Sequence, residues 1–82
     1  ELSSDERHEY AMDMIAARYA LTERERETAS LMARGYTAKH VAEDLTVAVS
    51  TVKGYSKSIY RKMGIHRKDE LIEIVKEIKK QV

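Results

Sequence analysis

The stretch from Leu45 to Lys68 contains six basic residues and no acid, and its side chains are the ones best suited to binding a ligand. The six are Lys53, Lys57, Arg61, Lys62, Arg67 and Lys68. Lysine and arginine neutralise phosphates and donate hydrogen bonds to guanine, so an acid-free basic block is a candidate nucleic-acid surface. Residues 1–19 have the opposite sign, with five acids against Arg7 and Arg18. In a chain whose formal net charge is only +1, this asymmetry predicts one basic face.

The other reactive side chains form no catalytic or metal-binding pattern. His8, His40 and His66 lie on different segments, at no spacing typical of a metal site and with no nucleophile and base beside them. We expect each to be a surface or capping residue. Because the chain has no cysteine, neither a disulfide nor a cysteine-bound metal holds the fold together. The sequence therefore predicts no enzyme, no metal site and no cofactor.

The elements that position the basic block are helices. Apolar residues recur at helical spacing along the whole chain, which has no proline, and no segment alternates like a strand. We expect five helices, and their predicted starts are Ser3 or Ser4, Thr22, Thr37, Ser50 and Arg67. Their predicted ends are Arg18, Arg34, Leu45, Met63 and Lys80. Thr22 and Glu25 fit a capping box, and the four methionines, Met14 among them, are expected in the core.

The helix predicted over 50–63 has two distinct faces when its residues are placed at 100° intervals. An apolar stripe predicted to face the core consists of Val52, Ser56, Ile59 and Met63. A second stripe, hereafter the basic stripe, consists of Ser50, Lys53, Gly54, Lys57 and Arg61. A solubilising surface usually mixes both charges, and this stripe has no acid. A short helix, a tight turn and this basic helix together favour a DNA-binding helix-turn-helix. The helix and turn lengths by themselves also fit an ordinary helical bundle.

Several motifs in this order resemble the LuxR-type domain, also called GerE- or FixJ-type, of bacterial transcription regulators. They are Leu21-Thr22-x-Arg24-Glu25, Ala33-x-Gly35, Val41-Ala42-x-x-Leu45, Ser50-Thr51-Val52-Lys53, Ile59-Tyr60-x-Lys62-x-Gly64-Ile65 and Glu70-Leu71. The resemblance covers about residues 20–78. It implies an all-α, four-helix domain over 20–82, preceded here by a linker helix over 1–19. Ala48 departs from the family, since many members have a capping serine there.

The resemblance also implies a role for particular residues. Residues 50–63 would form the recognition helix in the DNA major groove, with base contacts from Lys53, Gly54 and Lys57. Phosphate contacts would come from Lys39, Ser50, Thr51, Arg61 and Lys62. The last helix would pair two copies on an inverted repeat. The implied partners are double-stranded DNA, a second copy of the chain on DNA, and RNA polymerase.

In the first and last helices, apolar residues occur on more than one face, so we have to predict which of them face the core. In the last helix we expect Leu71, Ile74 and Ile78 to pack inward, and Ile72, Val75 and Lys79 to face a partner copy. In the first helix, Tyr10, Met14 and Ala17 form a stripe that we expect to dock loosely on the domain. The acidic charge of residues 1–19 argues against their contacting DNA.

The alternative is a protein-interaction or dimerisation module that has the same fold but has lost DNA binding. Such a module needs the apolar faces but not the acid-free basic stripe, so we favour DNA binding. No apolar run is long enough to cross a bilayer. We expect a cytoplasmic output domain of a longer regulator, tethered to a membrane if a sensor or membrane domain precedes it.

Overall fold

The computed structural model describes residues 1–82, which form five α-helices and no strand. The helices are α1 (Ser4–Tyr19), α2 (Glu23–Ala33), α3 (Ala38–Leu45), α4 (Val49–Met63) and α5 (Lys68–Lys79). Connections of three or four residues join them. The all-α prediction is confirmed, and the helix boundaries agree with those expected to within one residue.

Short polar side chains begin three of the helices. Ser3 precedes α1 and Thr22 precedes α2, and each forms a capping box with the glutamate three residues later. The box at Thr22 was predicted; its amide donates to Glu25 Oε1 at 2.8 Å. Thr37 caps α3 through the amide of His40 at 3.2 Å. These bonds satisfy helix amides that have no partner within the helix.

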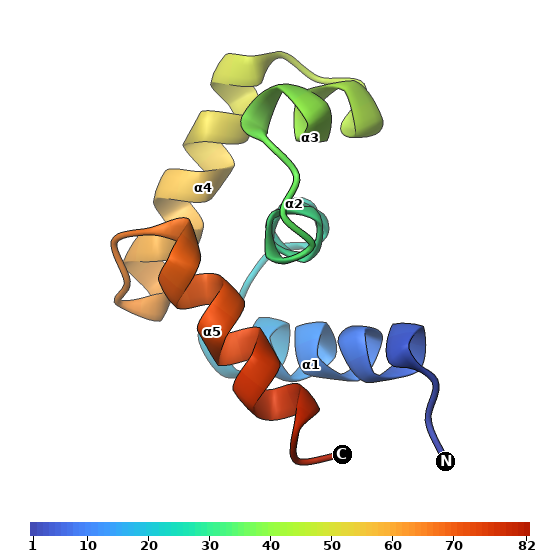
Figure 1. Ribbon diagram of the computed structural model, residues 1–82. Helices are drawn as coiled ribbons and strands as arrows, with labels where there is room; N and C mark the ends of the chain where they lie inside the picture. The colour runs from blue at the N-terminus through green and yellow to red at the C-terminus, as the bar shows by residue number, and fades with distance from the viewer.

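Helix α2 lies at the centre of the molecule and packs against the other four helices (Figure 1). Helices α3 and α4 pack together on one side of it, and α1 and α5 pack together on the other. Helices from both sides supply the buried core, which includes Met12, Ile15, Val41, Ile59 and Leu71. Helix α4 is therefore fixed to the α1–α5 pair mainly through α2.

Helix α1 packs through a different face from the one expected. Its buried residues are His8, Ala11, Met12 and Ile15, at the spacing of one helical stripe. Tyr10 and Met14 are each 44% exposed, so the predicted inward stripe is wrong, and Met14 is not a core residue. Met12 and Ile15 of α1 are among the largest fully buried side chains of the molecule, while Tyr10 and Met14 lie outside. Because Ala11, Met12 and Ile15 are at most 1% exposed, α1 is firmly packed rather than loosely docked.

Helix α5 also differs from the expectation. Val75, assigned to a partner copy, is only 3% exposed and belongs to the chain's own core with Leu71. Leu71 and Val75 are four residues apart, so they lie on one ridge of the helix. Ile74 and Ile78 are half-buried against the same core. Ile72 is half-buried and is not packed against this core, which leaves it as the apolar residue available to a partner.

Candidate nucleic-acid interface

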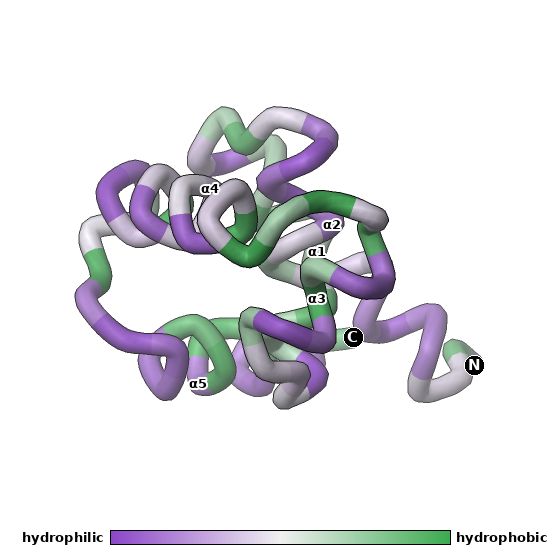
Figure 2. Tube along the Cα trace, turned by 90° about the horizontal axis from the view of Figure 1, so that it is seen from above, coloured by the Kyte–Doolittle hydropathy of each residue, from purple (hydrophilic) through white to green (hydrophobic).

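Helices α3 and α4 and the turn between them form the helix-turn-helix. The turn, residues 46–48, starts with Thr46 in the left-handed conformation at φ 57°. Val41 and Ala42 of α3 and Val52 of α4 are buried, and they lock the two helices against α2. Along α4 and α5, hydrophilic and hydrophobic residues alternate around the helix (Figure 2). The short helix, tight turn and longer basic helix are arranged as the sequence predicted.

The basic stripe of α4 faces away from the core. All five of its members are exposed: Ser50, Lys53, Gly54, Lys57 and Arg61. The opposite side buries Val52, Ile59 and Met63, and Ser56 is half-buried there, with its hydroxyl donating to the Val52 carbonyl at 3.0 Å. The two faces predicted from the helical spacing are thus the two faces that α4 presents.

The cations of this face are not neutralised by the rest of the protein. Lys53, Lys57 and Lys39 form no ion pair or hydrogen bond within the chain, and Arg61 has only a long contact to Ser58 Oγ at 3.4 Å. Several cations elsewhere in the fold are paired with acids. Arg26 of α2, for example, lies 2.7 Å from Asp13 and 3.0 Å from Glu9. The basic stripe is therefore a region of uncompensated positive charge.

Gly54 lies in the middle of this stripe without any packing need for a glycine. A Cβ built at this position meets no atom within 4 Å, and the backbone is ordinary helix. A glycine inside a helix costs about 1 kcal/mol relative to alanine. The internal structure gives no reason for that cost, whereas a glycine on an exposed face allows another molecule to approach the backbone closely.

Lys62 differs from the other predicted phosphate ligands because its ammonium is bound within the chain. Its Nζ lies 2.7 Å from Glu25 Oε1 and donates to the Ala20 carbonyl at 3.0 Å. The side chain is 27% exposed and points toward α2, away from the basic stripe. Its charge is thus already paired within the chain, and its role as a phosphate ligand stays a prediction.

Glu25 is a structural residue that the sequence identified only as a helix cap. Besides the Thr22 amide and Lys62, its carboxylate accepts a hydrogen bond from the Ser58 hydroxyl. Burial would raise the pKa of Glu25, but the bonds from Lys62, Ser58 and Thr22 outweigh burial and lower the pKa to about 2. One carboxylate thus joins the start of α2 to the C-terminal half of α4. The only sequence signal was that Glu25 and Lys62 both belong to the recognised motifs.

His8 is buried rather than at the surface, contrary to expectation. It is 3% exposed, and its Nε2 lies 2.9 Å from Ser30 Oγ on α2. Burial lowers the pKa of His8, and the nearby charges of Arg34 and Lys79 lower it further. His40 and His66 are exposed, and His40 lies beside the Tyr36 ring at 5.2 Å between ring centroids. His8 is thus a neutral packing residue that ties α1 to α2.

A hollow at the end of the basic stripe contains a residue that the sequence reasoning did not select. It has a volume of about 410 Å³ and is lined by Lys57, Tyr60, Arg61, Gly64, Ile65 and His66. His66 lies in the loop that follows α4 and lines this hollow together with Lys57 and Arg61. No group of three or more histidine or acidic side chains is arranged to hold a metal ion. None of the five helices combines the length and apolarity that a membrane span requires.

Comparison with known proteins agrees with this geometry. Residues 19–75 match the family described as bacterial regulatory proteins, luxR family. Among curated proteins, the chain is similar to the oxygen regulatory protein NreC of Staphylococcus aureus strains JH9 and JH1. Each is 43% identical over 53 residues, which cover 65% of this chain and 24% of the relative.

The chain thus spans about a quarter of the length of these relatives. No solved structure matches it. The family match covers more than half of the chain and includes all of α2, α3 and α4. The chain therefore belongs to the luxR family of bacterial regulatory proteins, and it is a DNA-binding helix-turn-helix domain of a transcription regulator rather than an enzyme.

Proposed function

We propose that this domain binds duplex DNA sequence-specifically by inserting α4 into the major groove. The observation that carries the proposal is the basic stripe, where Lys53 and Lys57 are exposed, unpaired and one helical turn apart. A helix fits the major groove, and lysine can donate to O6 and N7 of guanine there. Gly54, between them, lets the helix backbone lie close to the base edges.

The phosphate contacts come from residues around this stripe. Ser50 and Thr51 lie in the first turn of α4, Lys39 lies in the first turn of α3, and all three are exposed. Arg61 lies near the other end of α4. Such contacts orient a protein on the duplex and carry no sequence information, so Lys53, Gly54 and Lys57 supply the base readout. Lys62 instead fixes the position of α4 through Glu25.

Two copies bind an inverted repeat through α5. Ile72 is the apolar residue of that helix without a core contact, and Val75 is unavailable because it is buried. Lys79, the third residue assigned to the dimer, is half-buried and lines a hollow against the first turns of α1. An interface centred on Ile72 is small, so the two copies assemble mainly on DNA.

The domain is the output end of a longer regulator, since the curated relatives are about four times the length of the matched segment. In that regulator, RNA polymerase and an upstream sensor are the further partners, and the place of action is the cytoplasm. The printed name of the relatives, oxygen regulatory protein, describes those proteins.

The proposal is tested by fluorescence anisotropy with a random-sequence duplex and with a duplex selected by the domain from a random library. Lys53→Ala/Lys57→Ala should weaken binding to the selected duplex by about 1–3 kcal/mol for each lysine that donates to a guanine in bidentate fashion. Lys39→Ala should weaken both duplexes equally and flatten the salt dependence by about one unit.

The matched control is Lys76→Ala/Lys80→Ala, which removes the same charge from exposed positions on α5. If Lys53→Ala/Lys57→Ala binds the selected duplex with wild-type affinity, the proposed insertion of α4 into the groove is wrong. Absence of any salt-dependent binding to either duplex would instead favour the interaction-module alternative.

A further inference from the structure

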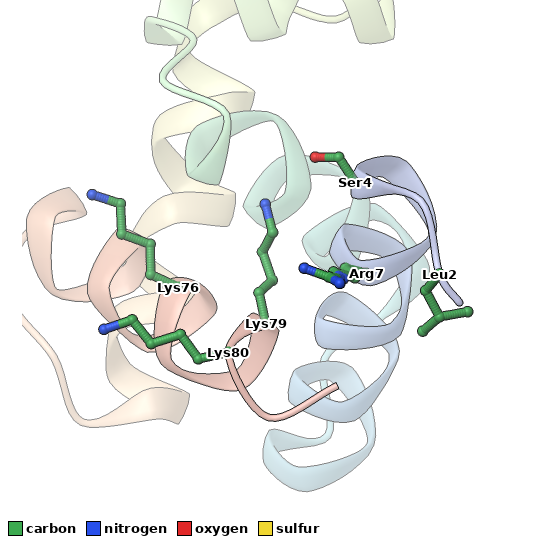
Figure 3. A pocket seen from close by; sticks show the side chains of 6 residues that line it. All are labelled: Leu2, Ser4, Arg7, Lys76, Lys79 and Lys80. Atoms are coloured by element: carbon green, nitrogen blue, oxygen red, sulfur yellow. The ribbon is translucent and has the colours of Figure 1, made fainter.

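A second strongly basic surface lies where the first turns of α1 meet the last turn of α5. A cleft of about 520 Å³ is lined there by Leu2, Ser4, Arg7, Lys76, Lys79 and Lys80. Figure 3 shows Arg7 of α1 and Lys79 of α5 extending into the space between the two helices, with Lys76 and Lys80 on the outer side of α5. Four of the six lining residues are cations, and none is an acid.

The charge of this cleft is largely uncompensated. Arg7, Lys76 and Lys79 have no carboxylate partner, and Lys80 has only the exposed Glu77 at 3.8 Å. The Nε of Arg7 is buried and has no hydrogen-bond partner. A buried donor without an acceptor is rare in proteins and costs free energy until something accepts from it. The cleft thus brings like charges together and leaves one donor unsatisfied.

Acids were available in the sequence to neutralise these cations, but the fold puts them elsewhere. Asp5 lies 3.6 Å from Arg34, and Glu9 and Asp13 bind Arg26. The fourth acid of α1, Glu6, accepts from the Ser3 amide in the capping box, so none of the four pairs with a cation of the cleft. Some exposed lysines at the end of α5 are expected, because cations stabilise a helix C-terminus. That explanation does not include Arg7, which comes from the first turn of another helix.

We propose that this cleft binds an acidic peptide segment of a partner protein, with carboxylates on Arg7 and Lys79 and an apolar side chain against Leu2. The cleft is much larger than a single phosphate, and Leu2, 40% exposed, gives it an apolar wall that a nucleic-acid backbone does not use. A duplex on α4 does not reach it, since α2 separates α4 from this end of α1 (Figure 1). The proposal does not rest on the contacts of α4 with DNA.

The test uses a labelled twelve-residue peptide of glutamate, aspartate and leucine, followed by fluorescence anisotropy on the full 82-residue chain. The peptide should bind, and binding should weaken at high salt because the charges are near the surface. Lys76→Glu/Lys80→Glu should weaken it about tenfold, since each reversal removes an attraction and adds a repulsion. Arg7→Gln should also weaken it, and circular dichroism and urea unfolding establish that each variant is folded.

The matched control is Arg18→Glu/Arg24→Glu, which makes the same change of charge at exposed positions outside the cleft and should leave the peptide affinity within about twofold of wild type. In all folded variants the affinity for a random-sequence duplex should also stay within about twofold of wild type. Equal binding of a glutamine, asparagine and leucine peptide would overturn the proposal. So would displacement of the acidic peptide by millimolar inorganic phosphate, which would mark a simple anion site. Loss of duplex affinity in Lys76→Glu/Lys80→Glu would make the cleft part of the DNA surface and overturn it as well.

Discussion

The ammonium of Lys62 lies 2.7 Å from the Glu25 carboxylate, across the contact between α4 and α2. The carboxylate side chain is 7% exposed and the ammonium side chain 27%. Because the same carboxylate also caps α2 and accepts from Ser58, the start of α2 and the orientation of α4 depend on one group. The angle at which α4 is presented is thus controlled from the side opposite to the basic stripe.

Lys62→Met should lower the free energy of unfolding by about 2–4 kcal/mol, because it leaves a buried carboxylate without its cation while keeping the packing of the stem. Urea unfolding measures this. At concentrations where the variant is folded, the slope of DNA affinity against salt should equal that of wild type. A slope flatter by about one unit would restore Lys62 to the phosphate contacts.

The stability of the domain should depend on pH through the ionisation of the Glu25 carboxylate. Its pKa is about 2 in the folded protein against 4.5 in the unfolded chain, so the unfolded state takes up a proton first as the pH falls. The stabilisation is complete above pH 4.5 and is lost progressively between pH 4.5 and about 2. Urea midpoints of wild type should therefore fall more steeply over this range than those of Glu25→Gln. Parallel curves for the two proteins would contradict the assignment.

Gly54→Ala should separate stability from function. The free domain should gain about 0.5–1 kcal/mol of stability, because the site is helical and open and alanine has the higher helix propensity. Affinity for the selected duplex should fall, since the methyl group lies on the face proposed for the groove. The matched contrast is Gly64→Ala, where a φ of +69° makes alanine destabilising. Increased stability with unchanged sequence preference would place Gly54 outside the groove.

Two substitutions test which residues of α5 remain for a partner copy. Ile72→Asp should leave the fold intact and abolish the two-to-one complex on a selected inverted-repeat duplex, as measured by sedimentation. Val75→Asp should unfold the domain, because an unpaired carboxylate would replace a side chain that is 3% exposed. If Ile72→Asp still forms the two-to-one complex, the interface lies elsewhere.

Two alanine substitutions compare the buried and the exposed side of α1. Ile15→Ala should cost about 2–5 kcal/mol of stability, because the side chain is 1% exposed and its removal leaves a cavity. Met14→Ala, next to it in the sequence but 44% exposed, should change stability by less than about 0.5 kcal/mol. Removal of residues 1–19 should accordingly destabilise the remaining helices. Equal effects of the two alanine substitutions would contradict the packing of α1.

The helix-turn-helix and both faces of α4 could be predicted from the sequence because that helix is amphipathic in only one way. Its apolar residues fall on one side and its basic residues on the other, so no choice had to be made. In α1 and α5 apolar residues occur on more than one side, and only the neighbouring helices decide which side is buried. Tyr10 and Val75 were misplaced for that reason.

The surroundings of Lys62 and His8 could not be predicted for a different reason. Each is defined by a partner far away in the sequence, Glu25 for Lys62 and Ser30 for His8. Helical periodicity contains no information on such pairs, because it describes one element at a time. Charge patterning predicted the exposed basic stripe, while the long-range pairs decide which cations near it are already bound within the chain.

The first turn of α4 has no side-chain cap, since Ala48 replaces the polar residue that begins the other early helices. The amides of Val49 and Ser50 make no bond within the chain. On the proposed docking these donors and the partial positive charge of the helix end face a backbone phosphate, so the nucleic acid completes the cap that the protein lacks. The stability of this turn is then thermodynamically linked to the ligand: part of the binding free energy orders the very element that reads the sequence.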